Sequence, residues 1–96
     1  MNRLVLSAQL VERGALRYTP AGLPALDMSL KHESEVSENG QPRKVFMEIK
    51  AMGIGEITTA LSSMALGGTG QFGGFLAAVR NGRGTRFHIT SVDPLV

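Results

Sequence analysis

The sequence predicts an all-β fold with one short helix, arranged as a five-stranded Greek-key barrel. Apolar and polar residues alternate in short stretches, which is typical of strands that bury one face. A single stretch changes to helical spacing, and it lies between the third and fourth predicted strands. With 96 residues and 43% apolar content, the chain has the size of one small domain, so we expect a single domain over residues 1–96.

The first strand and the turn after it are predicted near the N-terminus. Residues 17–24, RYTPAGLP, contain two prolines and a glycine, which restrict the backbone and predict a turn. The preceding stretch LVLSAQLV has apolar residues at alternate positions, which predict one buried strand face: Leu4, Leu6, Ala8 and Leu10.

The second and third strands are predicted to form a hairpin. ALDMSLKHE, residues 25–33, alternates cleanly, and KVFMEIKAM, residues 44–52, does so on the way back. The polar stretch 34–43 is expected to be a loop around Asn39-Gly40, because both residues of this pair tolerate the positive φ of a tight hairpin turn. The side chains expected to point inward are Leu26, Met28, Leu30, Val45, Met47, Ile49 and Ala51.

The remaining elements complete the order of three strands, one helix and two strands. Helical spacing over residues 54–66 predicts the helix, and Gly67-Gly68 is expected to end it. The glycine-rich stretch 70–80 and the stretch 85–92 predict the last two strands, which are joined through Asn81-Gly82. A helix between the third and fourth of five short strands is typical of an OB-fold barrel.

The composition limits the kinds of protein that the chain can be. The absence of cysteine excludes a disulfide scaffold, thiolate zinc sites and cysteine catalysis, and it fits a reducing cytoplasm. No signal peptide is recognisable, and no stretch approaches the roughly 20 apolar residues of a membrane span, so we expect a cytoplasmic protein without a membrane partner. Five methionines and five aromatic residues indicate a thin core, and from this we expect an oligomer.

Three sequence features that resemble cofactor, metal or catalytic sites are better explained by structural roles. GTGQFG, residues 68–73, matches a dinucleotide fingerprint, but it follows the predicted helix instead of opening one. His32 and His88 have no partner at metal-ligand spacing, and the glutamates between residues 33 and 38 fit a solvated hairpin tip. We therefore predict no cofactor, no metal and no catalysis.

Phe46 lies on the outward face of its predicted strand, between Lys44 and Lys50. An exposed aromatic residue is often part of a protein interface, and this alternative stays open. The flanking lysines favour a second interpretation, in which a nucleobase stacks on Phe46 while the lysines meet backbone phosphates.

The stretch RNGRGTRFHI, residues 80–89, begins as a basic and flexible loop. Arg80, Arg83 and Arg86 flank the last predicted hairpin, which is one of the loops that OB folds use to grip oligonucleotides. Gly82 and Gly84 allow this loop to wrap around a strand, and each guanidinium is able to contact a phosphate. A solvated hairpin without a ligand is the alternative.

The N-terminal part of the chain resembles bacterial single-stranded-DNA-binding proteins, through LRYTPAG at residues 16–22. The whole chain is similar to the PriB family, through NRLVLS at residues 2–7 and SLKHES at residues 29–34. The resemblance implies a homodimeric, non-catalytic OB fold that binds single-stranded DNA and acts between the restart helicase PriA and the loader DnaT. It also implies an accessory factor and not a general single-strand binder, since we expect no acidic tail beyond SVDPLV and the chain has no tryptophan.

The resemblance also assigns candidate DNA-binding residues. Phe46 occupies the place of a stacking aromatic residue, and Arg80 and Arg86 fall near basic positions of the last hairpin loop. Arg17 lies near another basic position, and Tyr18 is an equal candidate there because of a one-residue difference in length.

Two positions depart from the family. Glu33 and Ala78 stand where basic residues are common, so we expect weaker DNA binding than in other members and a larger share for protein partners. The first hypothesis is sequence-independent binding of single-stranded DNA, and the alternative is an OB-fold protein–protein adaptor with weak or no DNA binding. In the first hypothesis Phe46 stacks on bases, and the phosphate contacts come from Arg17, Lys44, Lys50, Arg80, Arg83 and Arg86.

Overall fold

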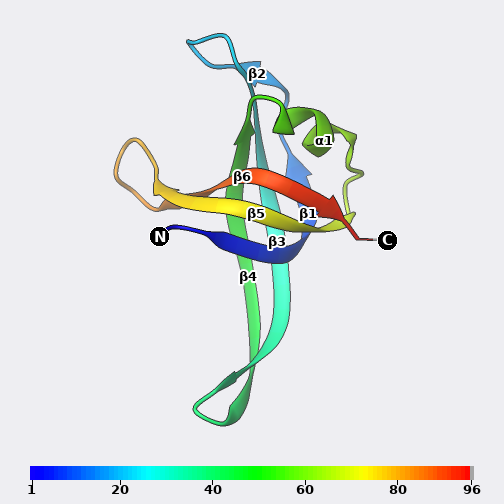
Figure 1. Cartoon of the computed structure of the whole chain (residues 1–96), viewed down its shortest axis with the longest axis vertical. Helices are drawn as coiled ribbons and strands as arrows, with labels where there is room; N and C mark the ends of the chain where they lie inside the picture. The colour runs from blue at the N-terminus through cyan, green and yellow to red at the C-terminus, as the bar shows by residue number, and fades with distance from the viewer. Residues whose placement is uncertain (96) are drawn as a thin grey trace.

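The computed structural model describes residues 1–95, and in these residues it contains six strands and one short helix (Figure 1). In chain order the elements are β1 (Leu4–Arg13), β2 (Arg17–Tyr18), β3 (Pro24–Glu38), β4 (Gln41–Ile54), α1 (Ile57–Ser63), β5 (Thr69–Ala78) and β6 (Thr85–Pro94).

Five of the strands close into a barrel. The sheet order is β1-β5-β6-β4-β3-β2, and β1 also pairs with β3, which joins the two sides of the sheet. All neighbouring strands are antiparallel except β4 and β6, which are parallel. The predicted five-stranded Greek-key OB-fold barrel is therefore confirmed, and β2 adds only a two-residue pairing at the edge of β3.

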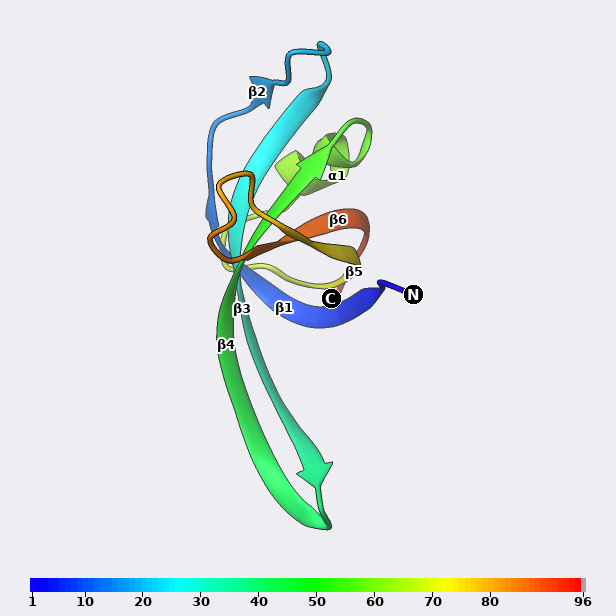
Figure 2. The same ribbon diagram turned by 90° about the vertical axis from the view of Figure 1, so that its left-hand side faces the viewer.

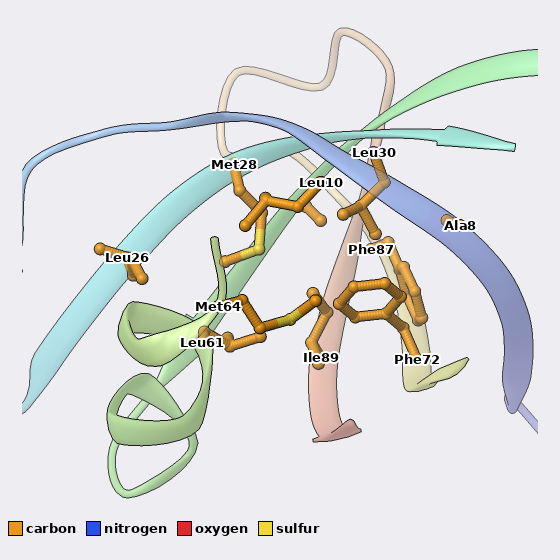
Figure 3. Close-up of a cluster of buried hydrophobic side chains, with 11 residues drawn as sticks. Ala8, Leu10, Leu26, Met28, Leu30, Leu61, Met64, Phe72, Phe87 and Ile89 are labelled. Carbon is orange, nitrogen blue, oxygen red and sulfur yellow. The ribbon is translucent and has the colours of Figure 1, made fainter. Parts of the chain in front are cut away.

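The alternating positions of the sequence form the core, as predicted. Side chains from β1, β3, β5 and β6 point toward one another inside the barrel, and Leu61 and Met64 reach it from α1 and the residue after it (Figure 3). Phe72 and Phe87 are fully buried at its centre. Two aromatic rings thus add large side chains to a core whose other members are aliphatic residues and methionines.

The glycine-rich strand bends as expected. The pairing of β5 with β6 shifts register between Gly73 and Gly74, which is the mark of a β-bulge. A Cβ atom on Gly74 would lie 1.8 Å from the carbonyl oxygen of His88, so no side chain fits there. Gly73, the last glycine of GTGQFG, lies at this bulge directly before Gly74, and the motif follows α1 instead of preceding a helix.

The predicted helix over residues 54–66 was too long at both ends. Ile54 belongs to β4, and Gly55 turns the chain with a φ of +87° before α1 begins at Ile57. Met64 is already extended, so α1 ends before Gly67. The helical spacing of apolar residues continues across both boundaries, although the helical backbone conformation does not.

The predicted loop over residues 34–43 was also wrong. The β3–β4 ladder runs without a register shift from Ala25–Ile54 to Glu38–Gln41, and only Asn39-Gly40 forms the turn, with φ values of 51° and 75°. The hairpin projects well beyond the barrel (Figures 1 and 2). Met47, which we expected to point into the core, is consequently 38% exposed.

The turn predicted over residues 17–24 contains the short strand β2, whose Arg17 and Tyr18 pair with Ala25 and Pro24. Within residues 1–95, no helix has both the length and the apolar character needed to cross a membrane.

Candidate nucleic-acid interface

Phe46 lies on the outer face of the projecting hairpin and is 66% exposed, as predicted. Because side chains alternate along a strand, Lys44 and Glu48 lie on the same face of β4. Glu33 stands directly opposite Phe46 on β3. An exposed ring held on a paired strand offers a π surface in a fixed position, which suits stacking of an unpaired base.

The surroundings of Phe46 are balanced in charge, contrary to the basic setting that its flanking lysines suggested. The outer face of the hairpin carries three lysines and three glutamates, and Lys31 Nζ lies 3.7 Å from Glu33 Oε1. Glu33, which we expected to depart from the family, places a carboxylate beside the ring. The charged residues of this face are Lys31, Glu33, Glu35, Lys44, Glu48 and Lys50.

Arg17 and Arg86 converge on the carboxylate of Asp27. Arg17 Nε donates to Asp27 Oδ2 over 2.9 Å and Arg17 Nη2 donates to Oδ1 over 3.2 Å. Arg86 Nη1 lies 3.5 Å from the same Oδ1. The hydrogen bond to Asp27 and the charge of its carboxylate raise the pKa of Arg17 above its ordinary value, so the Arg17 guanidinium stays charged.

Lys50 extends this group of cations along the outer face. Its Nζ donates to the buried Ser29 Oγ over 2.8 Å, and Ser29 stands two positions from Asp27 on β3. The parallel pairing of Ala51 with Phe87 places Lys50 and Arg86 at equivalent positions of neighbouring strands. We call Arg17, Lys50 and Arg86 the basic cluster.

The β5–β6 loop, residues 79–84, lies beside the barrel and not at the hairpin tip (Figures 1 and 2). Gly82 N donates to the Val79 carbonyl over 2.9 Å, and Arg83 N donates to Asn81 Oδ1 over 3.0 Å. Gly82 and Gly84 have φ values of 73° and 83°, which glycine adopts without strain. The backbone of the loop is thus folded on itself while its arginine side chains point outward.

Arg80 and Arg83 are exposed, and they form no ion pair with any residue in the described range 1–95. Their charges are therefore uncompensated and open to an anion. Ala78, the second position at which we expected a departure from the family, pairs with Thr85 at the base of this loop.

The candidate residues of β4 lie at two places along the strand. Lys50 belongs to the basic cluster, and Phe46 stands four residues farther toward the hairpin tip, about 13 Å away along the strand. Lys44 lies two residues beyond Phe46 on the same face, opposite Glu35. Tyr18 follows Arg17 on β2 and is exposed, and its side chain points to the opposite side of that short strand.

One pair of rings was missed by sequence reasoning. The rings of Phe75 and His88 stack with centroids 4.8 Å apart and an interplanar angle of 11°, and Phe75 is 38% exposed. His88 is in register with Met52 of β4, which stands opposite Asp27, so this pair adjoins the basic cluster on the outer face. The bulge at Gly73-Gly74 interrupts the alternation of β5, which is why no pattern marked Phe75 as outward.

His32 occupies a structural position inside the protein. His32 is buried, with Nδ1 2.6 Å from the Ser7 carbonyl oxygen and Nε2 2.8 Å from Ser34 Oγ. Since a carbonyl oxygen only accepts, Nδ1 carries the proton and donates. No group of three acidic or histidine side chains among residues 1–95 has the spacing of a metal site.

The chain is similar in sequence to proteins of replication restart. A family profile described as another single-strand binding protein family matches residues 2–91. Replication restart protein PriB of Bordetella pertussis is 51% identical over 80 residues, which cover 83% of this chain and 75% of that protein. PriB of Nitrosomonas europaea is 30% identical over 76 residues, covering 79% of this chain and 70% of that protein.

The chain is also similar in structure to a PriB protein and to a single-stranded DNA binding protein. PriB from Ralstonia solanacearum superposes with a TM-score of 0.90 at 37% identity, over 98% of this chain and 97% of that one. A deletion mutant of the single-stranded DNA binding protein from Thermus aquaticus superposes with a TM-score of 0.77 at 23% identity, over 100% of this chain and 51% of that one. At this sequence identity, the match to the Thermus aquaticus protein shows a shared fold and nothing more.

Proposed function

Because the chain belongs to the PriB replication restart family, we propose that it is a cytoplasmic, non-catalytic accessory protein of replication restart that binds single-stranded DNA without sequence preference. The observation that carries the proposal is one continuous outer face. It leads from Phe46 along β4 to Lys50 and then across to Arg86 and the β5–β6 loop.

In this proposal the bases and the phosphates are bound by different parts of that face. A base stacks on Phe46, and stacking accepts any base because each has a π surface. The backbone then runs along β4 toward the barrel, where phosphates meet guanidinium and ammonium groups. The proposed phosphate contacts are Arg17, Lys44, Lys50, Arg80, Arg83 and Arg86. Tyr18, on the opposite side of β2, is the alternative to Arg17 as a DNA contact from that strand.

Titration of a fluorescently labelled oligo-dT with the protein tests this proposal. Binding should weaken linearly in log affinity with log salt, with a slope of about −0.7 for each phosphate contact. Absence of binding at low salt would reject a DNA-binding function.

We further propose a homodimer. Residues Leu4–Ala8 of β1 pair with β5 along one edge, and their other edge has no strand partner within residues 1–95, since pairing with β3 begins at Gln9. An unpaired strand edge is a template for a second chain. Sedimentation equilibrium at micromolar concentration should give about twice the 10.2 kDa of the chain, and a stable monomer would contradict the proposal.

A second candidate function is a protein–protein adaptor that bridges a PriA-type helicase and a DnaT-like loader. The projecting hairpin favours it, because Phe46 on the outer face and Val36 and Met47 on the inner face are all exposed apolar side chains. The carboxylates beside Phe46 also disfavour an approaching phosphate. Pull-down of the helicase with and without oligo-dT distinguishes the two candidates, because a shared surface makes DNA and helicase compete.

A further inference from the structure

Asp27 holds two arginines that were each expected to bind phosphate. Both of its carboxylate oxygens are engaged by Arg17, over 2.9 and 3.2 Å, and one of them is also 3.5 Å from Arg86. Two parallel N–H···O contacts from one guanidinium are the arrangement that arginine adopts with a phosphate as well as with a carboxylate. The side chain of Asp27 therefore stands where an anion bound by both arginines would stand.

Arg86 retains unused donor capacity in this arrangement. Its contact with Asp27 is longer than a normal N–H···O hydrogen bond. Its Nε is buried and has no hydrogen-bond partner among residues 1–95. A buried donor without a partner favours an acceptor with better geometry than Asp27 provides.

The three side chains are accessible enough to exchange partners. Arg17, Asp27 and Arg86 are 47%, 44% and 36% exposed, and ion pairs with this exposure are weak. Within the trio one positive charge is offset, so two arginines present the net charge of one. A phosphate that binds either guanidinium also approaches the carboxylate, which repels it.

We infer that Arg17 and Arg86 form one phosphate site, and that Asp27 occupies it in the free protein and thereby limits the affinity for single-stranded DNA. The inference rests on the proposed DNA-binding function. It goes beyond that function because it identifies a carboxylate of the chain as a competitor of the DNA backbone.

The test compares Asp27→Asn with Asp93→Asn. These are the two aspartates of the chain, so each substitution removes one negative charge from a side chain of the same shape. Asp93 lies near the C-terminal end of β6, away from Arg86 at its beginning. Comparable melting temperatures of the three proteins establish that both variants fold, and Asp27→Ala repeats the measurement should asparagine lower the melting temperature.

Oligo-dT affinity is then measured over a series of salt concentrations. Asp27→Asn should bind about three- to tenfold more tightly at low salt, with a slope steeper by about 0.7, which corresponds to one additional phosphate contact. Asp93→Asn should change neither quantity by as much. In the Asp27→Asn background, Arg17→Ala should abolish the gain, whereas the same substitution in the native chain should have a small effect.

A second measurement separates this inference from the function on which it rests. Titration of the native protein and Asp27→Asn with inorganic pyrophosphate, followed through the arginine Nε–Hε resonances, reports the anion site without DNA. A tighter response of Arg17 and Arg86 in Asp27→Asn, with no oligo-dT binding by either protein, supports the site and rejects the proposed function. Oligo-dT binding that is equal or weaker in Asp27→Asn overturns the inference and leaves the proposed function standing.

Discussion

The outer face of the β3–β4 hairpin and the β5–β6 loop are both proposed to bind DNA, but they are built differently. The hairpin is a rigid ladder that exposes an aromatic ring among equal numbers of lysines and glutamates. The loop has two glycines with positive φ and two exposed arginines, and residues 79–84 include no carboxylate. A stacking surface tolerates compensated charge, whereas phosphate contacts need charge that is not already paired.

The largest effect, on stability, is expected at the β5–β6 pairing of the barrel. Gly74→Ala should lower the free energy of unfolding by about 3 kcal/mol, because its Cβ atom would meet the His88 backbone at 1.8 Å and disturb the β5–β6 pairing. Urea denaturation measures this.

Gly73→Ala is the matched control, because its nearest contact is the movable Ser91 Oγ at 2.6 Å and the expected loss is about 1 kcal/mol. Equal losses for the two variants would mean that the bulge does not depend on Gly74.

Phe46 should provide affinity that is independent of salt. Phe46→Ala should cost about 1–3 kcal/mol in oligo-dT binding, because it removes the stacking surface, while the salt slope stays nearly unchanged. Phe46→Trp should retain binding. Fluorescence anisotropy at several salt concentrations measures both quantities.

The outcome also decides between the two candidate functions. If Phe46→Ala binds oligo-dT normally but no longer retains a helicase partner in a pull-down, the hairpin is a protein interface. The oligomeric state must be the same in both proteins for this comparison, so sedimentation is measured on the same samples.

The loop should behave in the opposite way. Arg80→Ala combined with Arg83→Ala should lower the magnitude of the salt slope by about 1.4, which corresponds to two contacts. The loss of affinity should be about 25-fold near 0.1 M salt and should shrink as salt rises, since counterion release drives these contacts.

Arg43→Ala is the matched control for this double variant. Arg43 lies near the hairpin tip and its Nη1 already contacts Glu38 Oε1 at 2.8 Å, so its removal should change binding little. A loss from Arg43→Ala as large as that from one loop arginine would show that compensated and uncompensated cations are equivalent here.

The sequence was sufficient to predict the barrel because the buried positions alternate. It was insufficient for the hairpin, since residues beyond the barrel face water on both sides and lose that alternation. The ion pairs of Asp27 with Arg17 and Arg86 could not be predicted from the sequence for another reason. It depends on the pairings of β2 with β3 and of β4 with β6, which bring together residues from separate parts of the chain.

Glu33 should have the smallest effect, and it tests how far a neighbouring charge matters to stacking. Glu33→Gln removes the carboxylate opposite Phe46 and should strengthen oligo-dT binding by about 0.2–1 kcal/mol, which is the range of exposed charge interactions. Glu38→Gln, a change of equal charge near the hairpin turn, is the control. A gain confined to Glu33→Gln at low salt indicates that the DNA backbone passes close to Phe46. An equal gain from both variants, or none from either, would place the backbone away from the hairpin and leave its ring to a protein partner.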